Sequence, residues 1–545
     1  MSKTSSSALI KGTIILTLAT TICKILGFIY VVPFTALVGI QGNILFEYAY
    51  KPYILLLSIA TAGIPMAVSK FVSKYNELGD YRTGQRLFRS GLLITTFTGL
   101  LSCAVLFFLA PTIADFLISD NDSTGNSVKD VVFVIRMVSF ALIVVPPMAI
   151  VRGFFQGHQS MEPTSYSQVV EQLVRILFIL VAGFIIIHML KGSIATAVGF
   201  ATFAACLGAI AGSVVLVYYW LKRKQEFNEQ WKKSVSSSNV SLPSIYKELI
   251  SYAIPFVIVG LAIPLFQSID TFTINKAMMA TGAKQVEAET VNSIISLAQK
   301  VILIPVSLAT AFGLTLVPAM TKSYTAKKFD ELKDQMTKTF QVIFFLTIPA
   351  SIGLMVLGTP AFVTLFGLKD SAQGGFILSW SAPTAILFSL FTVTAAMLQG
   401  IDKQKYAVGS LLLGLVVKLI STYWFVTQFE GVGSIITTDI GMLVSIGINL
   451  YLLKKYVHFY FSSILRELFI ILLFCAIMSI CVWITTTILS SFFTPSYVFY
   501  ILCLTLGAAI GGGIYFVLSI RQGIFFHVLG NRFSFLQRFK KKPQY

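Results

Sequence analysis

Residues 468–520 read LFIILLFCAIMSICVWITTTILSSFFTPSYVFYILCLTLGAAIGGGIYFVLSI, without a single Asp, Glu, Lys or Arg. The run is long enough to cross the roughly 30 Å hydrocarbon core of a bilayer twice as helices. Comparable apolar runs recur along the 545-residue chain, which is 56% hydrophobic and only 12% charged, with a mean hydropathy of +0.82. Soluble proteins carry about twice that share of charge, and transmembrane β-strands alternate over only about 10 residues. The pattern predicts an all-α polytopic membrane protein.

The apolar runs between polar breaks predict about fourteen transmembrane helices, at residues 11–36, 44–70, 88–118, 130–152, 165–189, 194–221, 248–274, 290–319, 337–359, 374–398, 406–427, 432–453, 467–490 and 495–520. Basic residues test this count, because they concentrate in cytoplasmic segments. Thirty Lys and Arg fall on the N-terminal side of the predicted map, against five on the other side: Lys129, Lys191, Lys276, Lys284 and Lys369. This asymmetry predicts that both termini are cytoplasmic.

An internal repeat divides the chain. Span 4 ends in Gly153-Phe-Phe-Gln-Gly157 and span 10 in Met397-Leu-Gln-Gly400, and nineteen residues after each Gln comes a basic residue, Arg175 or Lys418. A six-helix unit used twice in one orientation predicts two lobes related by a pseudo-two-fold axis along the membrane normal. The predicted parts are an N-lobe (1–221), a basic, Ser-rich cytoplasmic linker (222–247), a C-lobe (248–454), two extra C-terminal helices (455–520) and a basic cytoplasmic tail (521–545).

Ten charges lie well inside the predicted spans, away from their ends. An ionised side chain at mid-membrane costs about 2.5–3.5 kcal/mol, so these groups must face each other or a water-filled interior. The cations outnumber the acids, which favours an anionic cargo over the organic cations that multidrug exporters handle. The cations are Lys24, Lys51, Arg136, Arg175, Lys300 and Lys418, and the acids are Glu47, Glu171, Asp270 and Asp439.

Several of these charges have a purely structural alternative. Glu47 and Lys51 are four residues apart, as are Glu171 and Arg175, so each pair could form an ion pair within one helix. Arg136 lies about two turns from a span end and could snorkel to the interface. For Lys24 and Lys300, which lie deep and have no carboxylate in helical register, we expect a role in a cavity that binds the substrate.

Asp270, Lys418 and Asp439 fall in predicted spans 7, 11 and 12. The lysine between two carboxylates predicts either a fixed structural pairing or an ammonium that stands in for a coupling cation. Both alternatives stay open at this point.

Other motifs are missing. The sequence contains no G-x-x-x-x-G-K-[ST] phosphate loop and no H-E-x-x-H cluster, so neither nucleotide hydrolysis nor metal catalysis is predicted. The six cysteines lie in apolar runs without a C-x-x-C pair and indicate small core residues. The net charge of +18 follows from membrane topology, so no nucleic-acid partner is expected. We predict a transporter rather than an enzyme.

Three motifs resemble a known family. Cys23-Lys-Ile-Leu-Gly-Phe28 is similar to the basic-x-Leu-Gly-Phe signature of the multidrug/oligosaccharidyl-lipid/polysaccharide exporter superfamily, and the Gln-Gly turns after spans 4 and 10 are also typical of it. The segment from Gln299-Lys-Val-Ile-Leu-Ile-Pro305 to Phe312-Gly-Leu-Thr-Leu-Val-Pro318 resembles span 8 of MurJ-type lipid II flippases. The resemblance covers essentially the whole chain and is nearest to the Gram-positive branch with YtgP-like and sporulation-type members.

This resemblance implies a flippase of the bacterial plasma membrane that moves lipid II between leaflets by alternating access of two lobes. Cavity cations would hold the pyrophosphate, with Lys24 and Lys300 at positions where the family has arginine and Lys51 as a third member. Another family arginine near the end of span 1 is replaced here by Tyr30 or Val31. The polyprenyl tail would follow a groove beside the last two helices.

The resemblance also implies partners and alternatives. Bilayer lipids and the cell-wall synthesis machinery are expected partners. No cofactor is expected, although transport could be coupled to the membrane potential, H⁺ or Na⁺. The alternative functions are export of another lipid-linked polysaccharide unit and multidrug antiport.

Overall fold

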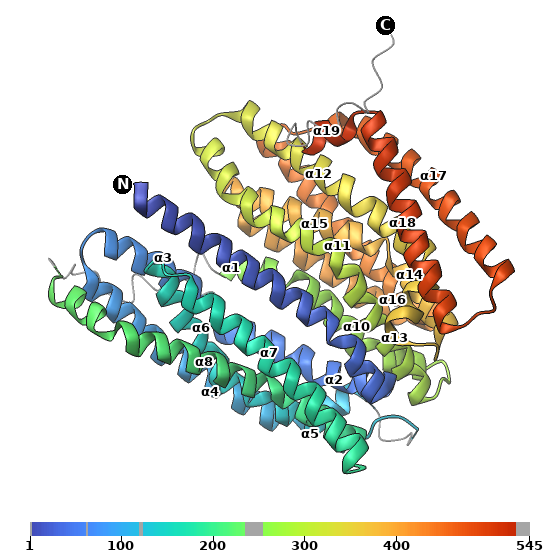
Figure 1. The fold of residues 1–545 in the computed structure, drawn as a ribbon, viewed down its shortest axis with the longest axis horizontal. Helices are drawn as coiled ribbons and strands as arrows, with labels where there is room; N and C mark the ends of the chain where they lie inside the picture. Colours follow the sequence, from blue (N-terminus) through green and yellow to red (C-terminus); the bar gives the residue numbers. More distant parts are fainter. Residues whose placement is uncertain (1–2, 62–63, 119–123, 235–253, 461, 530–545) are drawn as a thin grey trace, which may run out of the picture. The chain divides into compact units, whose positions relative to one another are not determined.

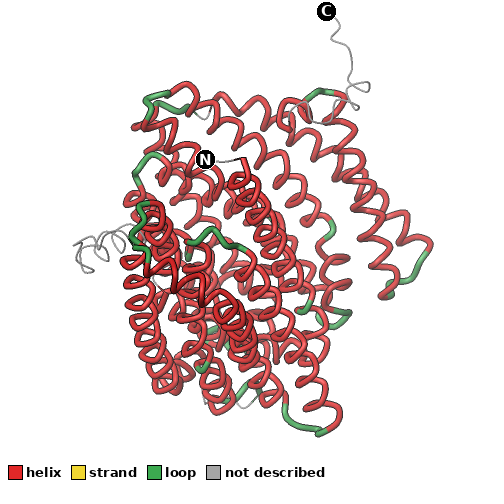
Figure 2. Tube along the Cα trace, turned by 60° about the vertical axis from the view of Figure 1, so that its left-hand side comes forward, coloured by secondary structure: helices red, strands yellow, loops and turns green. Residues whose placement is uncertain are grey.

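The structure, a computed structural model, describes residues 3–61, 64–118, 124–234, 254–460 and 462–529. Over these residues every regular element is a helix (Figures 1 and 2). The chain forms two compact units, residues 1–290 and 291–545. The predicted linker and tail lie partly outside the described residues, and the lobe boundaries predicted from the sequence stay a prediction.

The first unit is a bundle in which α7 and α8 lie side by side and α1 packs along α7 (Figure 1). Helix α2 packs against α4, α5 and α8, and α10 packs on α2 and α4. Apolar side chains such as Phe34, Tyr48 and Ile135 fill the core between them. Its helices are α1 (Lys3–Ile29), α2 (Val31–Thr61), α3 (Ile64–Glu77), α4 (Tyr81–Leu117), α5 (Val128–Ser139), α6 (Ala141–Gly157), α7 (Glu162–Phe184), the π-helix η1 (Ile185–Met189), α8 (Ile194–Lys232), α10 (Ala262–Met279) and the start of α11 (Gln285–Thr325).

The second unit contains the rest of α11 and the helices that follow it. Within this unit α12 packs against α15 and α17, α15 packs against α16, and α17 and α18 form a hairpin whose second helix also contacts α13. Its helices are α12 (Phe329–Val356), α13 (Gly358–Phe366), α14 (Ser371–Ser381), α15 (Thr384–Gly400), α16 (Gln404–Val457), α17 (Ser462–Phe492), α18 (Tyr497–Arg521) and α19 (Ile524–Leu529).

Polar residues at the predicted breaks start several helices. Asp80 caps α4 and Ser193 caps α8, because each side chain accepts a hydrogen bond from a backbone N–H of the first turn. Ser127 and Asp130 form a reciprocal capping box at the start of α5. Such caps stabilise a helix by about 1 kcal/mol each, so the polar residues between apolar runs fix where the spans begin.

Helix α2 contains a chain reversal at Gly39, whose φ of 71° and ψ of −176° are not helical. The rings of Phe34 and Phe46, on the two sides of the reversal, have centroids 5.3 Å apart. This positive φ favours glycine, which has no Cβ. The reversal separates the first two predicted spans, 11–36 and 44–70.

Helix α16 contains a second reversal at Glu430, where φ is 50° and ψ is −134°. Ser410 Oγ donates to Asn449 Oδ1 at 2.6 Å, and Thr422 and Thr437 hydroxyls lie 3.2 Å apart. Each of these contacts joins residues at similar distances in sequence before and after residue 430. The two halves of α16 therefore run antiparallel. A straight helix of 54 residues would be about 81 Å long, far more than one crossing needs.

Eleven helices in the described residues are long and apolar enough to cross a membrane, and a pair bent by 53°, Ile254–Gly260 with Ala262–Met279, adds a twelfth. Two of the eleven, Leu18–Thr61 and Gln404–Val457, contain the reversals at Gly39 and Glu430 and therefore count twice. The described helices thus match the fourteen crossings predicted from the sequence. The all-helical polytopic fold is confirmed.

Close helix contacts depend on glycine at two informative positions. A Cβ on Gly153, in the motif that ends span 4, would lie 2.4 Å from the Pro65 carbonyl oxygen. In the α16 hairpin, a Cβ on Gly414 would lie 2.4 Å from the Gly441 carbonyl oxygen. Any side chain at either position would push the backbones apart.

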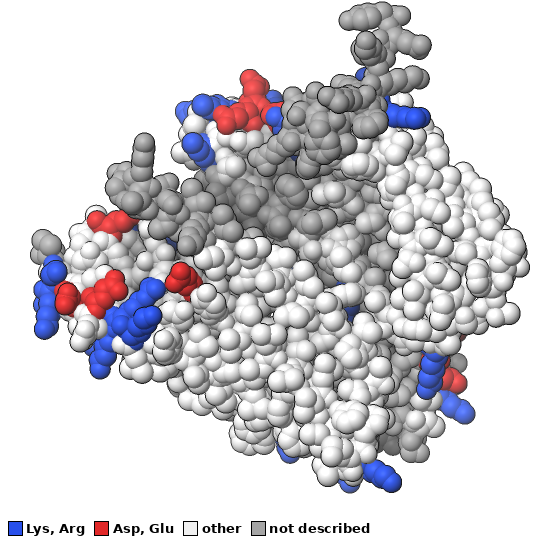
Figure 3. Space-filling view, in the orientation of Figure 1, with Lys and Arg blue, Asp and Glu red and all other residues white. Residues whose placement is uncertain are grey.

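The surface shows how charge is distributed within each unit. In the first unit, charged side chains gather at the end where α3, α4 and α8 meet (Figure 3). In the second, the hairpin of α17 and α18 shows an uncharged face (Figure 3). Phe469, Trp483 and Phe492 of α17 are exposed. An exposed apolar face of this size requires lipid around it.

Candidate functional site

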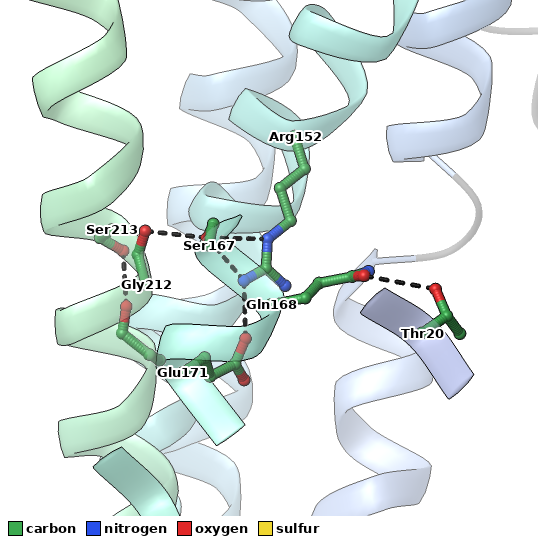
Figure 4. A network of polar contacts seen from close by, with 8 residues as sticks. Thr20, Arg152, Ser167, Gln168, Glu171, Gly212 and Ser213 are labelled. Carbon is green, nitrogen blue, oxygen red and sulfur yellow. Dashed lines mark hydrogen bonds and ion pairs between the residues drawn. The ribbon is translucent and has the colours of Figure 1, made fainter. Parts of the chain in front are cut away.

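Lys24 lies in the second half of α1 and its side chain is exposed. One turn earlier, Thr20 Oγ1 donates to Gln168 Oε1 of α7 at 3.4 Å (Figure 4). Because Lys24 sits within an apolar span, an exposed ammonium there needs water or an anionic ligand beside it. This environment suits the predicted cavity role.

Glu171 is paired with Arg152, and this corrects one structural alternative considered from the sequence. Arg152 Nη2 lies 2.7 Å from Glu171 Oε2, and its Nε and Nη2 also donate to Ser167 Oγ at 3.1 and 2.7 Å (Figure 4). Ser167 in turn donates to the Gly212 carbonyl at 2.8 Å. The short turn between α6 and α7 brings Arg152 opposite Glu171, so the predicted pairing with Arg175 is not formed.

Arg175 instead faces α2. Its guanidinium carbon lies 5.2 Å from the centre of the Tyr50 ring. Tyr30 and Tyr53 are also close to the guanidinium, while its Nε is buried without a hydrogen-bond partner. The Tyr50 ring therefore holds Arg175, because the face of an aromatic ring attracts a cation by about 0.5–2 kcal/mol.

Glu47 and Lys51 form the ion pair that their spacing allows. Lys51 Nζ lies 3.4 Å from Glu47 Oε2 and donates to Gln267 Oε1 of α10 at 3.0 Å. Both charged residues are buried, with 3% and 8% of their surface exposed. The pair also links α2 to α10, so it has a structural role in the first unit.

Arg136 packs against α4. Its guanidinium carbon lies 4.8 Å from the centre of the Phe107 ring, and its Nε donates to the Phe107 carbonyl at 3.4 Å. The neighbouring helix therefore holds this cation by a π contact and a backbone carbonyl.

Lys418 and Asp439 lie in the second unit, on the two halves of the α16 hairpin. Lys418 is completely buried and its ammonium donates to Thr438 Oγ1. Asp439 Oδ1 accepts a hydrogen bond from Thr384 Oγ1 at 2.7 Å. A buried ammonium among hydroxyls crosslinks the hairpin whether or not it has a further role.

Asp270 and Lys300 fall in different units. Asp270, on α10, belongs to the first unit and is 2% exposed. Lys300, on α11, belongs to the second unit and is half-buried. The predicted grouping of Asp270 with Lys418 and Asp439 stays a prediction.

Sequence reasoning missed three polar residues that the structure largely buries. Arg152 falls at the end of the predicted span 130–152, where a cation is expected in water, although just 14% of its side chain is exposed. Gln267 and Glu289 carry no motif, and both are buried. A polar residue within or beside an apolar run was the only available signal. No group of three or more His, Cys, Asp or Glu in the described residues could hold a metal ion.

His158 follows α6 at the charged end of the first unit. Its ring packs against those of Phe154 and Phe227, whose centroids are 4.3 and 5.1 Å away. Burial in this aromatic cluster lowers the pKa of His158 below its ordinary value. The neutral imidazole is therefore the form that the folded unit favours.

The helices and the charges that they bury define the class of protein: a polytopic membrane transporter with many crossings. The comparison with known proteins then gives the family. The chain is 43% identical over 531 residues to the lipid II flippase MurJ of Bacillus subtilis (strain 168), covering 97% of this chain and 98% of that protein. The family model for the lipid II flippase MurJ matches residues 257–504, and that for polysaccharide biosynthesis proteins matches residues 9–324. The chain belongs to the MurJ lipid II flippase family, a family of transporters.

More distant relatives and solved structures agree with the fold. Stage V sporulation protein B of Bacillus subtilis is 22% identical, over 75% of this chain and 76% of that protein. The structure of the lipid II flippase MurJ in an inward closed conformation matches with a TM-score of 0.67 at 15% identity, over 95% of this chain and 99% of that one. An inward-facing multidrug transporter of the MATE family gives 0.61 at 15% identity, over 79% and 98%.

Proposed function

We propose that this chain moves lipid II, the undecaprenyl-pyrophosphate-linked precursor of peptidoglycan, from the inner to the outer leaflet of the bacterial plasma membrane. The observation that carries the proposal is the 43% identity to a lipid II flippase along almost the whole of both chains. The match covers 97% of this chain, so it includes the helices at 455–520 that are predicted to bind the lipid tail.

A second candidate cargo is another lipid-linked polysaccharide unit. The match of residues 9–324 to polysaccharide biosynthesis proteins favours it, since such cargoes share the anionic phosphate and the polyprenyl tail. Multidrug antiport is the weaker alternative, because the buried charges in the spans are predominantly cationic and would repel organic cations.

Lys24 and Lys300 are our proposed ligands for the pyrophosphate. Both lie inside spans, and both side chains keep some exposure. An ammonium offers a point charge to a phosphate without the two-pronged geometry of arginine. The other three cations already have partners within the protein: Lys51 contacts Glu47, Arg136 contacts Phe107 and Arg175 contacts Tyr50. They would therefore act on the pyrophosphate only at longer range, through their positive potential.

Transport is proposed to proceed by alternating access without nucleotide hydrolysis. The membrane potential can supply the driving force, because it is worth about 2.3 kcal/mol per elementary charge per 100 mV. An anionic headgroup that leaves the negative interior moves down this gradient. Coupling to H⁺ or Na⁺ would add to this term, and no cofactor is needed.

The proposed orientation places both termini in the cytoplasm, since thirty basic residues lie on that side of the predicted map against five on the other. The lobes at 1–221 and 248–454 would move, and the hairpin at 455–520 would hold the lipid tail. Association with cell-wall synthesis enzymes is a further proposal, because they consume the translocated precursor.

The test is complementation in bacteria depleted of their own lipid II flippase, with lipid II on the inner leaflet as the readout. The wild-type chain is expected to prevent accumulation, while Lys24→Ala and Lys300→Ala are expected to fail at equal membrane levels. Lys129→Ala is the matched control, because Lys129 is an exposed lysine near the start of α5.

Full rescue by both cavity variants would overturn the residue assignment. Failure of the wild-type chain to clear lipid II would overturn the choice of cargo and favour a different lipid-linked saccharide.

A further inference from the structure

A buried carboxylate lies at the start of α11. Glu289 is fully buried, in the second turn of the helix. In the predicted map, Glu289 lies on the side of the membrane that carries few basic residues. It borders the loop between predicted spans 7 and 8. A carboxylate at such a position is usually solvated, so its burial needs a physical reason.

Asn126 supplies much of the surroundings of this carboxylate. Its backbone N–H donates to Glu289 Oε2 at 3.0 Å and its Nδ2 donates to the same oxygen at 2.9 Å. Gln285 Nε2, one turn earlier on α11, donates to Glu289 Oε1 at 3.1 Å and to the Asn126 carbonyl at 2.8 Å. The segment before α5 is thereby tied to the first turns of α11.

Gln41 adds the third segment, the reversal between the first two spans. Its Nε2 donates to the Val286 carbonyl and to Thr290 Oγ1, each at 3.1 Å. Its own carbonyl accepts a hydrogen bond from Asn126 Nδ2 at 3.3 Å. Three segments far apart in the sequence therefore meet around one carboxylate, all within the first unit.

The fit around Glu289 is close. A Cβ on Gly125 would lie 2.8 Å from Glu289 Oε2 and 2.9 Å from Gln285 Cγ. Only glycine lets the 124–127 segment approach the carboxylate this closely.

The chemistry of the junction suits repeated opening. Hydrogen bonds join the three segments, and water can replace each of them when the segments part, so a hydrogen bond has a modest net free energy. An apolar contact would instead expose hydrophobic surface to water each time the segments part, which is unfavourable. Glu289 itself lies near the start of a helix that continues from Gln285 to Thr325.

We propose that Gln41, Asn126, Gln285, Glu289 and Thr290 form a latch that closes the outer side of the transporter, with the Glu289 carboxylate at its centre. The outward-opening step breaks the hydrogen bonds between α11 and the other two segments. The outer location rests on the proposed orientation, whereas the latch itself does not depend on the identity of the cargo.

The test measures access to a cysteine placed behind the latch. Ser293→Cys lies one turn beyond Glu289 on α11, and Ser293 is fully buried. In a background without the six native cysteines, a membrane-impermeant maleimide added to intact cells is expected to label this cysteine slowly. Glu289→Gln keeps the side-chain volume but replaces one acceptor oxygen with an NH₂ group, so the side chain can no longer accept hydrogen bonds from both Asn126 and Gln285. Labelling is therefore expected to accelerate at least about tenfold.

Two further variants separate the latch from a general loss of structure. Asn126→Asp places a second carboxylate beside Glu289 and should also accelerate labelling. Combining Asn126→Asp with Glu289→Gln reverses donor and acceptor, so the side-chain hydrogen bond can form again and labelling should slow toward the wild-type rate.

Glu287→Gln is the matched control. Glu287 is exposed on the same turn of α11 and accepts a hydrogen bond from the Lys284 backbone N–H at 3.2 Å, so its loss should leave labelling unchanged. The latch is refuted if both single variants label at the control rate, or if the double variant labels faster than either. Correct labelling without lipid II transport would leave the latch standing and refute the proposed function.

Discussion

The ion pair between Arg152 and Glu171 can be tested quantitatively by a double-mutant cycle. The structure joins these two side chains at 2.7 Å and directs Arg175, the partner that helical spacing suggested for Glu171, toward Tyr50. The perturbations are Arg152→Gln, Glu171→Gln and the double variant. A parallel cycle with Arg175→Gln and Glu171→Gln serves as the control.

The expected coupling follows from the geometry. A hydrogen bond to a charged group contributes about 1.5–3 kcal/mol, whereas neutral side-chain pairs in membrane proteins average only about 0.6 kcal/mol. The Arg152 and Glu171 side chains retain 14% and 21% of their exposure, which screens part of the attraction. We therefore expect a coupling free energy of about 2 kcal/mol between them.

The assay is thermal unfolding of the purified protein in detergent, followed by tryptophan fluorescence. For a unit of this size, about 2 kcal/mol corresponds to a loss of about 4 °C in Tm. Each single variant should lose about this much, and the double variant little more. In the control cycle the two losses should add, within about 0.5 kcal/mol. Coupling in the Arg175 cycle with additivity in the Arg152 cycle would refute the pairing in the structure.

Three other predictions address separate features. Gly153→Ala should lower Tm by several degrees, because its Cβ would lie 2.4 Å from the Pro65 carbonyl oxygen. Gly447→Ala is the control, because a Cβ at position 447 meets no atom within 4 Å. Equal losses of Tm in the two variants would contradict the packing argument. Because burial lowers the pKa of His158, the unfolded chain binds more protons than the folded one as the pH falls through the ordinary value of about 6.5. Stability should therefore fall between pH 7.5 and 5.5, and the fall measured by Tm should be smaller in His158→Gln; an unchanged fall would exclude His158 as its source. If the buried ammonium of Lys418 stands in for a coupling cation, exchange of Na⁺ for K⁺ should change the flipping rate less than about twofold, and strict dependence on Na⁺ would contradict that role.

Much of the fold could be predicted from the sequence, because the free energy of burying an apolar segment in a bilayer depends on local composition. The predicted spans on both sides of residues 39 and 430 bracket the reversals that the structure shows at Gly39 and Glu430. Each residue lies within the bounds of a single helix, α2 or α16. The breaks between apolar runs in the sequence therefore located the ends of the membrane crossings better than the helix bounds did.

The partners of the buried charges were harder to predict. Spacing alone allowed both the Glu47–Lys51 and the Glu171–Arg175 pairs, and only the first is formed. The outcome for Glu171 depends on the packing of α6 against α7, which no local pattern encodes. Glu289 was missed for a related reason: a carboxylate at a span boundary is expected in water until tertiary contacts bury it.

The central claim, that this chain moves lipid II, is tested most directly with the purified protein in proteoliposomes that contain lipid II and carry a membrane potential. The account predicts that lipid II reaches the opposite leaflet with the wild-type chain and with Lys129→Ala, but not with Lys24→Ala. Absence of lipid II movement by the wild-type chain, under conditions in which it moves another polyprenyl-linked saccharide, would contradict the account.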